Sequence, residues 1–168
     1  HARWALRGHQ LTMAHHPLMF RSSVQLTQFL RDLATFVTNQ VELAHIPVSS
    51  PPEYGSSALA NFSRVADAVG LNVSLWWPSS LGNDALDAAA RAMPRLNSVF
   101  FPGGDGGSLV WPQLASAARL LRRSHPSASV WVSAQELSAD QLDSFFVALS
   151  RPNVSNWLTG VVYGPHTR

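Results

Sequence analysis

The pattern of hydrophobic and polar positions repeats five times along the chain. Each unit has a stretch with apolar residues at helical spacing, then a breaker, then a short apolar run. The breakers are Asn39, Gly70, Pro94, Pro126 and Pro152. Gly accepts the left-handed conformation that ends many helices, and Pro cannot continue a helix. The apolar runs are rich in Val, Leu, Phe and Trp, which is typical of strands buried on both faces of a parallel sheet.

This pattern predicts both the strands and the helices. We expect strands to begin near positions 41, 72, 98, 129 and 160, and a further strand at about Trp4 to Leu6. Amphipathic helices are expected over residues 23–37, 57–69, 84–93, 112–123 and 138–149. In the first of these, one face is expected to carry Val24, Leu26, Phe29, Leu30, Leu33 and Phe36. The N-cap candidates are Ser23, Asn83 or Asp84, and Ser138.

Strict alternation of strands and helices favours a parallel sheet with right-handed crossovers. The expected strand starts are 31, 26, 31 and 31 residues apart, and a (β/α)8 barrel of ~250 residues has ~31 residues per unit. The fold prediction is therefore an α/β, TIM-like parallel (β/α) barrel in a single partial domain over residues 1–168. It would hold six strands and five helices and lack the last two strands. An open, doubly wound sheet is the alternative.

The chain has 168 residues, of which 46% are apolar and 13% charged, as expected for one folded domain. It begins with His1, so we expect a processed chain or a piece of a longer one.

The net charge of the chain is +2 and its arginines are scattered, which argues against a nucleic-acid partner. No apolar stretch is long enough to cross a membrane. Cysteine is absent, which excludes disulfides and leaves the compartment open, secreted or periplasmic locations included.

Candidate chemistry gathers where the expected strands end, because parallel α/β sheets bind ligands at the carboxyl ends of their strands. Asp105 stands alone among four glycines just after an apolar run. A carboxylate there can serve as a general base, stabilise positive charge or accept hydrogen bonds from hydroxyls. An Asp-Gly turn, in which Asp bonds its own backbone, is the alternative. The glycine run has neither the Gly-Lys-Ser/Thr of a phosphate loop nor a dinucleotide fingerprint.

Glu42 lies inside an apolar strand, where an unpaired charge is costly. It therefore needs a partner, with Arg7 as the natural candidate, and the pair can be structural or functional. Trp76 and Trp77 are adjacent in a strand, so their side chains point to opposite faces. Either one of them stacks on a sugar ring or both belong to the core. Gln135 and Tyr163 are candidate hydroxyl-binding groups.

Three histidines, His9, His45 and His166, also follow expected strands. No metal site is predicted from them, since neither an H-x-H nor an H-E-x-x-H spacing is present. No cofactor is predicted either.

Six segments together resemble a known family. They are "RGHQL", "FLRDLATFVTNQVEL", "VSLWWP", "VFFPGGDGG", "HPSASVWVSAQ" and "GVVYGP". In this order they resemble the barrel domain of glycoside-hydrolase-like proteins, largely uncharacterised bacterial members of the broad group that contains hexosaminidases and α-glucuronidases. The resemblance covers nearly the whole chain, and "PGGDGG" with "WVSAQ" is its most specific part. It implies a (β/α)8 fold and a carbohydrate substrate.

The resemblance carries over only in part to the catalytic residues. Hexosaminidases of this kind place an Asp-Glu pair after the fourth strand. Asp105 matches the Asp, whereas Gly106 stands where the Glu would be. We therefore expect a glycosidase-like enzyme whose catalytic carboxylates are Asp105 and Glu42. The expected substrate-binding residues are His9, Gln10, Trp77, Gln135, Tyr163 and His166. The alternatives are a non-catalytic carbohydrate-binding barrel and a nucleotide-binding domain with phosphate on the glycine loop.

Overall fold

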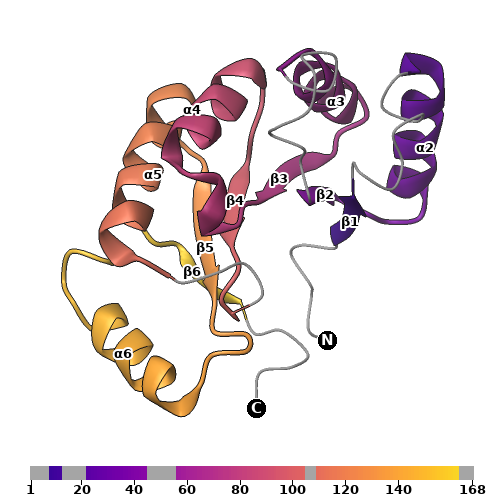
Figure 1. The fold of residues 1–168 in the computed structure, drawn as a ribbon. Helices are drawn as coiled ribbons and strands as arrows, with labels where there is room; N and C mark the ends of the chain where they lie inside the picture. The colour runs from indigo at the N-terminus through magenta and orange to yellow at the C-terminus, as the bar shows by residue number, and fades with distance from the viewer. Residues whose placement is uncertain (1–7, 13–21, 45–55, 105–108, 163–168) are drawn as a thin grey trace. The chain divides into compact units, whose positions relative to one another are not determined.

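The protein is represented by a computed structural model that describes residues 8–12, 22–44, 56–104 and 109–162 (Figure 1). Within these residues, six strands form one parallel sheet in chain order from β1 to β6. The strands are β1 (Gly8–Thr12), β2 (Gln40–Ala44), β3 (Asn72–Trp76), β4 (Ser98–Phe101), β5 (Ser129–Ser133) and β6 (Gly160–Val162). The helices are α2 (Ser23–Thr35), α3 (Ser56–Ala68), α4 (Asn83–Ala92), α5 (Trp111–Ser124) and α6 (Ala139–Leu149), with a short 3-10 turn, η3 (Ser79–Leu81).

The structure confirms a parallel α/β fold, with six strands and five α-helices among the described residues. Five of the strands begin within one residue of the predicted positions. The position predicted for the first strand was wrong, because β1 runs from Gly8 to Thr12, and residues 4–6 lie outside the described residues. The reason is that β1 has little apolar character: Gly8, His9 and Gln10 are exposed and only Leu11 is buried.

Local capping sets the helix boundaries. Ser138 is the N-cap of α6 as predicted, and it forms a reciprocal capping box with Gln141. The N-cap of α2 is Ser22, one residue before the predicted Ser23, and its hydroxyl accepts a hydrogen bond from the backbone N–H of Gln25 at 3.3 Å. These hydroxyls satisfy N–H groups that the first helical turn leaves without partners.

The apolar face predicted for α2 is only partly correct. Leu26 and Leu30 are fully buried, but Val24 and Phe36 are each 80% exposed. Val24 lies in the first turn and Phe36 is the C-cap, beyond the last helical residue. Both therefore lie at the ends of the helix, outside the part of the helix that packs on the protein.

The chain divides into two compact units. Unit 1 comprises His1–Leu75 and Ala88–Asn97, and unit 2 comprises Trp76–Asp87 and Ser98–Arg168. Figure 1 shows α2 and α3 on the same side of β1, β2 and β3 in unit 1. The core of this unit includes Leu26, Leu30, Val41, Leu43, Leu59, Phe62, Val73 and Leu75.

The strands of unit 1 alternate between two faces, since successive side chains point to opposite sides of a sheet. Val41 and Leu43 of β2 are fully buried, whereas Glu42 between them is half-buried and polar. His9 of β1 has an edge-on contact with Phe29 of α2, with ring centroids 6.3 Å apart, so the odd-numbered positions face the helices. The prediction of strands buried on both faces is only partly correct for this unit: on the other face, which is polar, Ser74 is buried, but Gln10 is exposed and Glu42 is half-buried.

In unit 2 the core is formed by β4, β5 and α5. The contributing side chains are Val99, Phe101, Val130, Val132, Leu114, Ala117, Ala118 and Leu121. Figure 1 shows α6 near the N-terminal end of α5. Trp111, the first residue of α5, accordingly contacts Phe145 of α6, with ring centroids 5.6 Å apart.

Candidate functional site

A row of three polar side chains crosses the strands of unit 1 at one level. Gln10 of β1 pairs with Glu42 of β2, and Glu42 pairs with Ser74 of β3. Side chains at paired positions of parallel strands lie on the same face of the sheet. Gln10 Nε2 donates to Glu42 Oε1 at 2.9 Å, and Ser74 Oγ is 3.5 Å from Glu42 Oε2. We refer to Gln10, Glu42 and Ser74 as the polar row.

The carboxyl group of Glu42 is the titratable centre of the polar row. Burial raises the pKa of the Glu42 carboxyl above its ordinary value of 4.5, because removal from water disfavours the charged form. The hydrogen bonds from Gln10 and Ser74 lower this pKa, but burial is the larger effect. A carboxylic acid with a raised pKa keeps its proton closer to neutral pH, which is the property required of a general acid.

The polar row brings together two of the predicted site residues, Gln10 and Glu42, and adds Ser74. Arg7, the predicted partner of Glu42, lies outside the described residues. Ser74 was missed in the sequence, yet a signal for it is present: Gln10, Glu42 and Ser74 follow each other at intervals of 32 residues. This interval is close to one βα unit of a (β/α)8 barrel, ~31 residues, and equivalent positions of successive units lie side by side.

The end of β4 lies tightly against the end of β5 in unit 2. A Cβ atom at Gly103 would come within 2.5 Å of the backbone oxygen of Ser133 and 2.9 Å of that of Gln135. A Cβ atom at Gly104 would lie 2.7 Å from the Cβ of Glu136. Two glycines of the predicted loop are thus required by this close approach of backbones.

Gln135, predicted to bind hydroxyls, is positioned by this contact. Its backbone N–H donates to the hydroxyl of the buried Ser133 at 2.9 Å. The next residue, Glu136, has a positive φ of 56°, which is uncommon for a residue other than Gly. The segment after β5 is therefore held in one conformation by a turn, a hydrogen bond and the two glycines that follow β4.

Of the other predicted site residues that the structure describes, His9 and Trp77 do not join the polar row. His9 lies on the opposite face of β1, against Phe29. Trp77 is 1% exposed, and its indole N–H donates to the backbone oxygen of Gly82 at 3.3 Å, so its ring is a core element with no open face for a sugar. Asp105, His45, Tyr163 and His166 lie outside the described residues.

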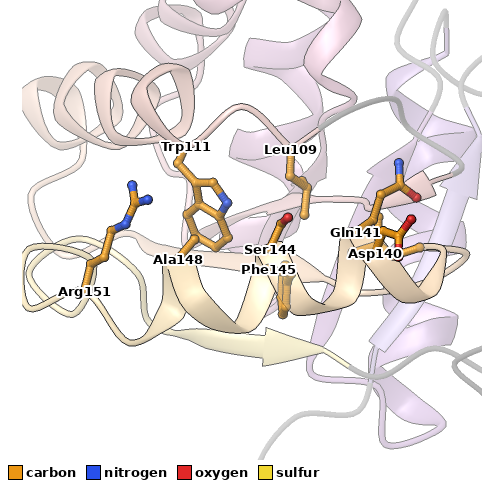
Figure 2. Close-up of a pocket in the computed structure, with 9 residues that line it drawn as sticks. Leu109, Trp111, Asp140, Gln141, Ser144, Phe145, Ala148 and Arg151 are labelled. Carbon is orange, nitrogen blue, oxygen red and sulfur yellow. The ribbon is translucent and has the colours of Figure 1, made fainter.

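Two neighbouring cavities in unit 2 are lined by residues that the sequence reading did not single out. The larger has a volume of about 470 Å³ and the smaller about 290 Å³, and both are lined by Trp111 and Arg151. Figure 2 shows the larger one, with Arg151 at one end, Asp140 and Gln141 at the other, and Trp111 between them. Trp111 and Arg151 are distant in sequence, and only the packing of α6 near the start of α5 brings them together.

No group of three or more His, Asp or Glu side chains has an arrangement that would hold a metal ion among the residues that the structure describes. Their longest helix, α5, has 14 residues, and none of the described helices has the length and apolar character needed to span a membrane.

Comparison of the whole sequence with protein-family models and with curated proteins gives no match.

Proposed function

We propose that this protein is a carbohydrate-active (β/α) barrel protein that acts on glycosidic bonds, with Glu42 as an acid of the reaction. The observation that carries the proposal is the Glu42 carboxyl group, which is half-buried, has a raised pKa and is hydrogen-bonded within the polar row. Glycosidases use a protonated carboxyl group to donate a proton to the leaving-group oxygen.

The strand order supports a barrel over a doubly wound sheet. Doubly wound sheets reverse their strand order at a switch point, and nucleotides bind there. The six described strands instead follow each other in sequence without a reversal. When every right-handed crossover leads to the next strand on the same side, all the helices cover one face of the sheet. This is the arrangement found in a (β/α) barrel. The polar row on the other face would then point into the barrel.

A glycosidase needs two carboxyl groups, ~5–5.5 Å apart for retention and ~6.5–9.5 Å apart for inversion. Asp105 is the proposed second carboxylate, since it follows β4 in the sequence and matches the Asp expected from the resemblance. Glu42 would protonate the leaving oxygen. Gln10 and Ser74 act as positioning residues, because they hold the carboxyl group of Glu42 in one orientation.

The test is hydrolysis by the Glu42→Gln variant. On a panel of unsubstituted oligosaccharides, we expect the release of reducing ends to fall by roughly 10²–10⁴-fold, the usual contribution of a general acid. On dinitrophenyl glycosides, whose leaving group needs no proton, the loss should be much smaller. The matched control is Asp32→Asn, which removes an exposed carboxylate that accepts a hydrogen bond from Gln28 on α2. Equal losses on both substrate classes, or no loss, would contradict the role of Glu42.

Non-catalytic carbohydrate binding is the second candidate, favoured by the distribution of acids in unit 1. The other two described acids of this unit are used elsewhere: Asp32 bonds to Gln28, and Asp67 forms an ion pair with Arg95. Thus no second carboxylate joins the polar row among the described residues. Under this alternative, calorimetry would show heat of saccharide binding to the wild-type protein while no member of the panel releases reducing ends.

A further inference from the structure

The two cavities of unit 2 are lined by aromatic side chains that pack on one another. Trp111 contacts Phe145 with ring centroids 5.6 Å apart and Trp157 with ring centroids 6.0 Å apart. Phe145 and Trp157 are 2% and 8% exposed, whereas Trp111 is half-buried and lines both cavities. The indole of Trp111 is therefore packed against two buried aromatic rings and still borders both cavities.

The turn that carries Trp157 is fixed by an arginine of α5. Arg122 donates hydrogen bonds to the backbone oxygens of Asn156 and Trp157, at 2.8 and 3.0 Å. Val154, in the same turn, is buried at 4% exposure. The wall of the smaller cavity is thus already ordered before any ligand binds, which reduces the entropic cost of binding.

The smaller cavity is cationic. Arg119 of α5 and Arg151, which follows α6, both line it, and no acidic residue is found among its described lining residues. Neither guanidinium group forms an ion pair within the described part of the chain. Asn153 adds a side-chain amide with two donors and an acceptor. An anion in this cavity would relieve the repulsion between two neighbouring positive charges.

We propose that this cleft, lined by Trp111, Arg119, Arg151, Asn153 and Trp157, binds an acidic saccharide. Arginine pairs with carboxylates through two parallel hydrogen bonds, which gives it geometric selectivity for that group. The indole ring supplies a flat apolar face for a sugar ring, and Asn153 can bond its hydroxyl groups. The larger cavity shares Trp111 and Arg151 with this cleft, so the ligand can be longer than one sugar residue. The choice of a sugar as the ring-bearing anion rests on the proposed function, while the preference for an anion rests on the two arginines.

The experiment is calorimetric titration with trigalacturonate and with its neutral counterpart, galactotriose. We expect the wild-type protein to bind trigalacturonate more tightly than galactotriose, and 0.5 M NaCl to weaken only the acidic ligand. Arg119→Gln and Arg151→Gln should each weaken trigalacturonate binding on the order of tenfold, as expected for the loss of a charge-assisted hydrogen bond. The control is Arg123→Gln, an exposed arginine of α5 that lines neither cavity.

Equal affinity for the two trisaccharides would overturn the proposal, as would unchanged binding in both arginine variants. These variants replace exposed side chains, so loss of folding does not confuse the result. A failure of saccharide binding at the cleft can be distinguished from a failure of the proposed function. The loss of hydrolysis in Glu42→Gln would stand without an effect of Arg119 or Arg151, and arginine-dependent binding would stand without hydrolysis.

Discussion

The side-chain amide of Gln10 donates a hydrogen bond to the carboxyl group of Glu42 from the directly paired position on the neighbouring strand, with the two atoms 2.9 Å apart. This bond opposes the effect of burial on Glu42, since it stabilises the charged form whereas burial disfavours it. The balance between the two effects sets the protonation of the carboxyl group, so removal of the Gln10 hydrogen bond should raise the pKa of Glu42.

The first prediction concerns the stability of Glu42→Gln as a function of pH. The pKa of Glu42 is raised in the folded state, so the folded protein binds more protons than the unfolded chain between 4.5 and that raised pKa. The contribution of Glu42 to the free energy of unfolding of the wild type should therefore fall as pH rises through this window. Above the window it should stay constant. Glutamine carries no charge, so the variant lacks this fall.

Melting temperatures of both proteins from pH 4 to pH 8 provide the measurement. We expect the melting temperature of Glu42→Gln to rise relative to that of the wild type as pH rises through this window. A wild-type protein that gains stability relative to Glu42→Gln with rising pH would mean that the folded state favours the charged carboxylate.

The second prediction concerns Gln10. Replacing it by Met keeps the approximate size of the side chain but removes a hydrogen bond that lowers the pKa of Glu42. The pKa of Glu42 should rise further, and the alkaline limb of the pH profile of hydrolysis should move to higher pH. The matched control is Gln28→Met, which removes a similar bond, of 2.8 Å, from Gln28 to Asp32 on the exposed side of α2. A limb that stays in place, or moves to lower pH, would show that Gln10 does not act on the titrating group.

The third prediction concerns the contact between the ends of β4 and β5. In Gly103→Ala the added methyl group would overlap the backbone oxygens of Ser133 and Gln135. We expect the free energy of unfolding to fall by about 1–3 kcal/mol, the usual cost of overpacking. In Gly8→Ala the nearest atom to the new Cβ is the backbone oxygen of Gln40, 4.0 Å away, so the change should stay within about 0.5 kcal/mol. Chemical denaturation of the two variants tests this, and equal effects would contradict the tight contact at Gly103.

The fourth prediction concerns the end of α2. Val37 has a φ of +70°, and it follows the C-cap in a Schellman arrangement in which Val37 N–H bonds to Ala34 and Thr38 N–H bonds to Leu33. A β-branched residue is strained in this conformation, whereas Gly is not. Because Val37 is 57% exposed, Val37→Gly sacrifices little burial. Relief of about 1–2 kcal/mol of strain exceeds the entropic cost of Gly, about 0.5–1 kcal/mol, so the free energy of unfolding should rise by about 0.5–1 kcal/mol.

The contrast for Val37 is the same substitution at Val24, which is also exposed but lies in the first turn of α2, with ordinary helical geometry. There Gly lowers helix propensity, so Val24→Gly should not stabilise the protein. A loss of stability in Val37→Gly equal to that in Val24→Gly would show that the positive φ stores no strain.

Periodicity predicted most of the fold because the breakers and apolar runs are strong local signals. Strands at 72, 98, 129 and 160 begin where predicted, since each follows a helix terminated by Gly or Pro or by a Pro-containing turn. The first strand was misplaced because β1 presents polar residues on one face and His9 under α2 on the other. An edge strand with one buried apolar side chain gives no apolar run to detect.

The site was predictable only where a local anomaly marked it. Glu42 stands out as a charge inside an apolar strand, and its row partner Gln10 was named among the candidates. Ser74 has no such anomaly, because a serine in a strand is unremarkable until the register places it beside Glu42. The cleft around Trp111 and Arg151 depends on the placement of α6 near the N-terminal end of α5, which no local pattern encodes.

The most direct test is an NMR titration of the Glu42 side-chain carboxyl carbon in the folded protein, in the wild type and in Gln10→Met. We expect a titration midpoint above pH 4.5 in the wild type and a higher midpoint in the variant. A wild-type midpoint at or below 4.5 would contradict the assignment of Glu42 as a proton donor.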